Sequence, residues 1–130
     1  MPVIFIILSF FSHSAWSASH HPQELLNKIS GSKTEGQRIV QHYCAMCHAV
    51  KPLIPLGAPR IGEASDWKLR LKQGSKRLFK HTDEGLNAMP ARGGCFECTD
   101  HQLMLAILAM LPEDLILDKM ACVFLHNGAE

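Results

Sequence analysis

The chain has 130 residues, 47% of them hydrophobic, and a formal net charge of +1 at pH 7. This length allows one domain of ordinary size, and the near-neutral charge argues against nucleic acid as a partner. Residues 51–92 nevertheless carry 9 basic and 4 acidic side chains, whereas residues 93–130 carry 1 basic and 6 acidic. Such a gradient either orients the protein on a partner or is an ordinary solvated surface.

Residues 1–17 are predicted to form an export signal. The apolar run at residues 3–11 is too short to cross a bilayer but has the length of the hydrophobic part of a signal peptide. Ala15 and Ser17 are small residues at the positions expected for cleavage after Ser17. No Lys or Arg precedes the run, so an uncleaved anchor in the inner membrane is the alternative. Either way, the rest of the chain is expected outside the cytoplasm, where disulfides persist.

Residues 18–33 form a polar segment with room for a turn or two of helix at residues 24–29, and we assign it no function. The main domain is expected at residues 34–111. Its first helix is predicted to start at Thr34 and to run into Cys44.

Gly36, Val40 and Cys44 recur at every fourth residue of this predicted helix, so they are expected on one face. Glycine inside a helix costs about 1 kcal/mol relative to alanine. We therefore expect another helix to approach the backbone closely at Gly36.

The pentapeptide Cys44-Ala45-Met46-Cys47-His48 follows. Its two thiols lie about one helical turn apart, so both can reach the vinyl groups on one edge of a haem and form thioethers. The histidine then presents its imidazole to the iron. Two anchors followed by one ligand are the c-type haem attachment signature. The alternative is a bare cysteine pair, either a redox dithiol or half of a zinc site, with the histidine beside it by chance.

Residues 51–62 are rich in proline and glycine and are predicted to be a loop, which offers backbone carbonyls to the second ring nitrogen of His48. Helices are expected next at residues 63–73 and 75–84. The first of them holds Trp67. This side chain lies either at a haem edge, with its N–H free for a propionate, or in the core as an ordinary tryptophan.

The irregular segment at residues 85–94 contains Met89, which lies 41 residues beyond His48. A methionine thioether is a common second axial ligand in electron-carrying haem proteins, and it raises the reduction potential. Of the 6 methionines, Met89 is the one in a loop, where the backbone can aim its sulfur at iron. His81 is the competing candidate, and ligation by two histidines would lower the potential.

Cys95 and Cys98 form a second Cys-x-x-Cys pair ahead of a predicted helix, in which Thr99 and Gln102 match a capping box. Two such pairs in one chain are also compatible with zinc. Because the first pair is followed by His48 and the chain is predicted to be exported, we favour a local disulfide. A catalytic dithiol is the remaining hypothesis.

Residues 36–111 resemble a bacterial class I cytochrome c and, within that class, are most similar to the cytochrome c-5 type. The stretches that carry the resemblance are CAMCH at residues 44–48, GAPRIG at residues 57–62 with Trp67 shortly after it, and GLNAMPARGGCFECTD at residues 85–100. The combination of Ala-Met-Pro with a downstream Cys-x-x-Cys is far more specific than the haem motif alone.

The resemblance implies an all-α fold, the small class I cytochrome c fold, with four to five helices around one haem c attached covalently through Cys44 and Cys47. It implies that the first and last helices cross at Gly36 and Val40. It also implies the three remaining features of the site, namely a Pro59 carbonyl bonded to His48, Met89 as sixth ligand and a disulfide between Cys95 and Cys98.

Such proteins shuttle single electrons between periplasmic redox proteins, and the same function is expected here. With His48 and Met89 both bound, iron has no open position, so the protein is expected to be a carrier rather than an enzyme. The alternatives are a haem protein with an open sixth site, which would bind ligands or act as a peroxidase, and a haem-free zinc or dithiol protein.

Residues 112–130 extend beyond the usual end of such domains. Their apolar residues favour a plain helix packed on the domain. Cys122 is the odd fifth thiol, and it either pairs between chains to give a dimer, stays reduced and buried, or contacts a partner.

Overall fold

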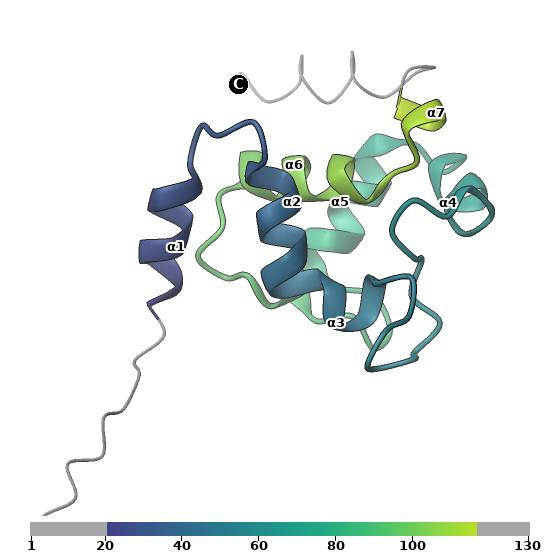
Figure 1. Cartoon of the computed structure of the whole chain (residues 1–130). Coiled ribbons are helices and arrows are strands. Elements are labelled where there is room, and N and C mark those ends of the chain that lie inside the picture. Colours follow the sequence, from purple (N-terminus) through teal and green to yellow (C-terminus); the bar gives the residue numbers. More distant parts are fainter. Residues whose placement is uncertain (1–20, 117–130) are drawn as a thin grey trace, which may run out of the picture.

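The computed structural model describes residues 21–116 (Figure 1). The predicted export signal at residues 1–17, Cys122 and most of the C-terminal extension therefore lie outside the described residues. The helices are α1 (Pro22–Ile29), α2 (Glu35–Ile39), α3 (Ala45–His48), α4 (Ala64–Leu71), α5 (Ser75–Glu84), α6 (Asp100–Met110) and α7 (Glu113–Leu115), with a π-helical turn at Val40–Cys44 and a 3-10 turn at Ala91–Gly94.

Within residues 21–116 the regular secondary structure is helical, and the one β-type pairing is an isolated bridge between Leu86 and Met89. The expected all-α class is therefore confirmed. Each helix in this part of the chain is too short or too polar to cross a lipid bilayer.

Helices α2 and α6 cross closely at the centre of the fold (Figure 1). A Cβ atom placed on Gly36 would lie 2.3 Å from the carbonyl oxygen of Leu105 and 3.3 Å from the Cβ of Ala109. Any side chain at this position would force the two helices apart. The expected close approach of a second helix at Gly36 is confirmed.

Helix α2, which leads into the haem-type motif, does not continue as a regular α-helix to Cys44. After Ile39 the chain makes a π-helical turn, in which the N–H of Ala45 bonds to the carbonyl of Val40 five residues earlier. One extra residue in a turn rotates the following residues by about 100° around the axis. Gly36, Val40 and Cys44 therefore do not share the single α-helical face that their spacing predicts.

Helix α1 packs into the same core as the rest of the domain, although the polar segment at residues 18–33 was assigned no role from the sequence. Leu26 and Ile29 are 1% and 2% exposed. Burying an aliphatic side chain of this size contributes about 1.5–3 kcal/mol. The packed unit therefore includes α1.

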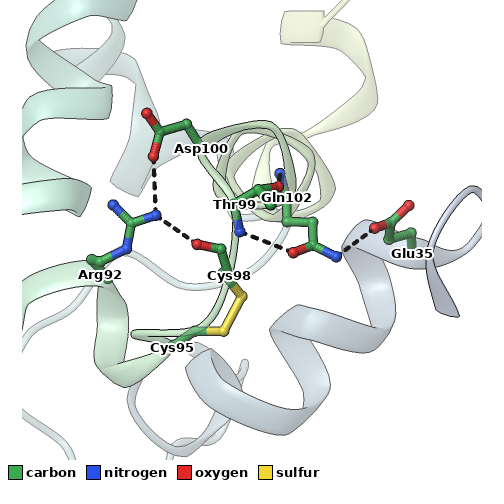
Figure 2. Close-up of a disulfide and its surroundings, with 7 residues drawn as sticks. All are labelled: Glu35, Arg92, Cys95, Cys98, Thr99, Asp100 and Gln102. Atoms are coloured by element: carbon green, nitrogen blue, oxygen red, sulfur yellow. Dashed lines mark hydrogen bonds and ion pairs between the residues drawn. A yellow bond between two sulfur atoms is a disulfide. The ribbon is translucent and has the colours of Figure 1, made fainter. Parts of the chain in front are cut away.

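The N-terminus of α6 is joined to α2 by a chain of hydrogen bonds (Figure 2). Thr99 and Gln102 form the predicted capping box, with bonds of 3.2 and 2.9 Å between side chain and backbone. The Gln102 amide also donates to the buried Glu35 carboxylate at 2.9 Å, and the second oxygen of Glu35 accepts from Gly31 at 2.7 Å. These bonds fix where α6 begins relative to α2.

Helices α4 and α5 follow the long loop. The sequence predicts helices at residues 63–73 and 75–84, and the second prediction is confirmed to the residue. The first helix is shorter because the chain turns at its end, where Gln73 and Gly74 donate to the carbonyls of Arg70 and Leu71. Gly74 then adopts a φ of 87°, which glycine tolerates without strain.

Candidate functional site

The two cysteines of the Cys-x-x-Cys-His motif lie on consecutive helical turns. Cys44 ends the π-helical turn, Cys47 lies on α3, and both are free and half-buried. Burial, together with the neighbouring Cys47, raises the pKa of the Cys44 sulfur to about 11. At neutral pH Cys44 is therefore a thiol, which is the group that adds to a vinyl carbon to form a thioether.

His48 at the end of α3 is only 6% exposed, and its Nδ1 lies 2.8 Å from the carbonyl oxygen of Pro59. A carbonyl oxygen only accepts hydrogen bonds, so the proton of the neutral ring resides on Nδ1. The lone pair is then on Nε2, which is the state of histidine that ligates a metal. The residue that sequence similarity indicated as partner of His48 lies within hydrogen-bond distance of it.

An ion pair follows directly after Pro59 and fixes the loop. The backbone N–H and the Nε of Arg60 bond to Asp66 Oδ2 at 3.0 and 2.8 Å, and its Nη2 bonds to Oδ1 at 3.2 Å. Hydrogen bonds from Arg60 lower the pKa of Asp66 to about 2. Sequence reasoning missed this pair, although an aspartate in the first turn of α4 after an arginine-containing loop was the available signal.

Trp67 is 3% exposed, and its indole N–H donates to the carbonyl of Arg60 at 2.8 Å. Indole has this single donor. It is therefore not free for a haem propionate, and of the two alternatives for Trp67 the structure shows a core tryptophan. Its hydrogen bond supports the loop that carries Pro59.

Met89 lies in a tight reverse turn after α5. The backbone N–H of Leu86 bonds to the Met89 carbonyl at 3.1 Å, and the N–H of Met89 bonds to the Leu86 carbonyl at 2.9 Å. Asn87 has a φ of 54° within this turn. A Cβ on Gly85 would lie 2.7 Å from the Met89 oxygen, so only glycine fits at the base of the turn. Backbone geometry therefore holds Met89 in place.

Met89 and Cys44, which are far apart in sequence, come together at Gly93. A Cβ built on this glycine would lie 3.8 Å from Met89 Cε and 3.9 Å from Cys44 Sγ. Because this residue is glycine, it places no side chain of its own beside the two sulfur-bearing residues. Two free thiols, an imidazole with its proton fixed on Nδ1 and a nearby thioether are the donor set that a haem c requires.

The second cysteine pair forms a disulfide between Cys95 and Cys98, which are 1% and 4% exposed. Sulfurs joined to each other do not ligate zinc. Within residues 21–116 no group of three or more His, Cys, Asp or Glu side chains is arranged to hold a metal ion. His81, the competitor of Met89, lies in the regular part of α5.

Arg92 is a second residue that sequence reasoning missed. Its guanidinium forms an ion pair with Asp83 on α5. It also pairs with Asp100 and donates to the carbonyl of Cys98 (Figure 2). The only signal in the sequence is a basic residue in a glycine-rich loop with acidic residues on either side. The loop that carries Met89 is thereby joined to both neighbouring helices.

An exposed apolar surface adjoins the haem-type motif. We call the following side chains the apolar loop surface: Met46, Val50, Leu53, Ile54 and Leu56. The N–H of Ile54 bonds to the carbonyl of Met46 at 3.0 Å, which folds the loop back onto α3. Several exposed apolar side chains close together in sequence and next to a functional motif are compatible with a docking site.

The chain is similar to known proteins over this region. The family described as "Cytochrome C oxidase, cbb3-type, subunit III" matches residues 31–107. Cytochrome c5 of Azotobacter vinelandii is 38% identical over 79 residues, covering 59% of this chain and 92% of that protein. Cytochrome c5 of Ectopseudomonas mendocina is 34% identical over 82 residues, covering 62% and 91%. Cytochrome c-555 of Prosthecochloris aestuarii is 33% identical over 86 residues, covering 60% and 84%. No solved structure gives a significant match.

Proposed function

Because the chain belongs to the class I c-type cytochromes, which are haem-based electron carriers, we propose that it carries single electrons between periplasmic redox proteins. Members of this family bind haem c covalently. In this chain Cys44 and Cys47 would form the thioethers, and His48 and Met89 would ligate the iron. The bound haem supplies an iron that accepts and releases one electron.

The observation that carries the proposal is the bond between His48 Nδ1 and the Pro59 carbonyl. It fixes the ring orientation and leaves the lone pair of Nε2 for iron. The two free thiols that precede the histidine complete the attachment motif.

Met89 is proposed as the sixth ligand because its turn brings the side chain beside Gly93 and Cys44. His81 is held by the regular geometry of α5, whereas Met89 lies in a loop that two backbone hydrogen bonds with Leu86 hold in a tight turn. Ligation by both His48 and Met89 fills the iron coordination. The proposed role is therefore a carrier, since no position remains for a substrate or for oxygen.

The apolar loop surface is proposed as the place where redox partners dock. It adjoins the proposed thioether cysteines, and apolar contact excludes water between two electron-transfer proteins. The charge gradient along the chain would orient each encounter. Location in the periplasm rests on the predicted export signal at residues 1–17.

Absorption spectra of the holoprotein test the ligation. The chain is expressed in a host that matures c-type cytochromes, and Met89→Ala is compared with Met104→Leu, which changes a half-buried methionine of α6. In its oxidised form the wild-type protein should show the weak band at the red end of the visible spectrum that marks a thioether-iron bond. Met89→Ala should lose this band and lower the reduction potential, and Met104→Leu should keep both.

Three results would overturn the proposal. Colourless protein would exclude haem, and a high-spin wild-type spectrum would indicate an open sixth site. A Met89→Ala spectrum identical to the wild type would show that another residue ligates the iron.

A further inference from the structure

The side chain of Arg92 joins the Met89 loop, residues 85–94, to the two helices that flank it. Its guanidinium forms an ion pair with Asp83 on α5. It forms another with Asp100 on α6, where Nη2 lies 3.0 Å from Oδ1. Nη2 also donates to the Cys98 carbonyl at 2.7 Å, next to the disulfide (Figure 2). One side chain in the loop therefore contacts three groups on its borders.

The backbone of the loop does not make these connections itself. Among the described residues, its hydrogen bonds outside the 3-10 turn are local: they join Leu86 with Met89, Gly93 with Pro90, and Cys95 with Arg92. Arg92 also has a φ of 56°, in the left-handed region that side-chain-bearing residues rarely adopt. The guanidinium contacts offset this unfavourable backbone conformation and fix the loop against α5 and α6.

The chemistry of these contacts depends on arginine. The Arg92 side chain is 21% exposed, and the side chains of Asp83 and Asp100 are 39% and 69% exposed. The planar guanidinium presents several N–H donors at fixed angles, so it can serve three acceptors at once. A lysine ammonium is a single point charge on a flexible stem and cannot reproduce this geometry.

We propose that Arg92 is a positioning residue that keeps the Met89 loop closed and thereby keeps the thioether on the iron. This inference rests on the proposed ligation by Met89. When the loop opens, the sixth position becomes available to an added ligand. The apparent affinity for that ligand equals its intrinsic affinity multiplied by the fraction of molecules with an open loop, so it reports how firmly the loop is held.

The experiment is an imidazole titration of the oxidised holoprotein. Binding is monitored through the loss of the weak absorption band, at the red end of the visible spectrum, that marks the thioether-iron bond. Arg92→Gln should bind imidazole roughly tenfold more tightly than the wild type, or more, because charge-assisted bonds to two helices are lost. Arg92→Lys should fall between the two. Lys80→Gln is the matched control, since it removes a positive charge from α5 whose ion pair with Glu84, at 3.8 Å, is exposed and does not involve the Met89 loop.

A residue with a merely structural role would lower the unfolding midpoint without changing the imidazole affinity. The proposal would therefore be overturned if Arg92→Gln bound imidazole within about twofold of the wild-type affinity, as the Lys80→Gln control is expected to do. If Arg92→Gln does not fold, Asp83→Asn and Asp100→Asn weaken the same contacts from the other side, and both should tighten imidazole binding. A wild-type protein without the thioether band would contradict the proposed ligation instead, so the two failures are distinguishable.

Discussion

The imidazole Nδ1 of His48 lies 2.8 Å from the carbonyl oxygen of Pro59. The following residue, Arg60, holds this part of the loop in place. Arg60 binds Asp66 at the start of α4 through its backbone N–H and its guanidinium. Trp67 donates to the Arg60 carbonyl from the same helix. The orientation of the proposed iron ligand therefore depends on an ion pair and an indole that belong to α4.

The ion pair makes stability depend on pH in the acid range. Hydrogen bonds from Arg60 lower the pKa of Asp66 to about 2, below the ordinary value of about 3.9. A lowered carboxyl pKa adds stability above the unfolded value, and this contribution is lost as the pH falls from about 4 to about 2. Denaturant unfolding at several pH values should show a shallower acid limb in Asp66→Asn than in the wild type. Asp114→Asn, at an exposed site on α7, should keep the wild-type slope, and equal slopes in all three proteins would contradict the prediction.

Gly36→Ala should destabilise the fold although alanine is the better helix former. The added Cβ would meet the Leu105 carbonyl oxygen at 2.3 Å, so α2 and α6 must separate. Overpacking of this kind costs about 1–3 kcal/mol, and the gain in helix propensity of about 1 kcal/mol offsets only part of it. The free energy of unfolding in denaturant measures the difference. Gln37→Ala, on the exposed side of α2, should stay within about 0.5 kcal/mol of the wild type, and an equally stable Gly36→Ala protein would show that the crossing is loose.

Local signals in the sequence were sufficient for a large part of the fold. Gly74 and Gly85 bound the helix at residues 75–84, and the structure places α5 there. The capping box at Thr99 fixes the start of α6. Gly36 is unfavourable inside a helical pattern, and its presence there indicates the helix crossing. Each of these features depends on residues that are close together in sequence, so a short window contains the information.

The remaining features depend on contacts that no short window contains. The π-helical turn at residues 40–44 inserts one residue, and an α-helical pattern does not show this. The partners of Arg92 lie on two different helices, and Glu35 bonds to a glutamine 67 residues away. Trp67 was equally compatible with two environments, because only the folded loop determines which acceptor its N–H reaches.

Glu35 and Gln102 should be energetically coupled because they form a buried side-chain bond of 2.9 Å between α2 and α6. Removing the amide alone leaves a buried carboxylate oxygen without its partner, which costs about 1–3 kcal/mol. A double-mutant cycle with Glu35→Gln, Gln102→Ala and the double variant should give a coupling energy of about 0.5–3 kcal/mol. A cycle that pairs Gln102 with exposed Gln37 serves as control and should give none. Strict additivity of the first pair would show that the bond contributes no specific stabilisation.

The disulfide between Cys95 and Cys98 should stabilise the fold only modestly. It closes a short loop, so the entropy that it removes from the unfolded chain corresponds to about 2 kcal/mol. The double variant Cys95→Ser/Cys98→Ser should lose that amount in denaturant unfolding. It should also bind imidazole more tightly in the oxidised holoprotein, since the Cys98 carbonyl is one of the three groups that hold Arg92. Unchanged stability together with unchanged imidazole affinity would show that the Met89 loop keeps its position without the disulfide.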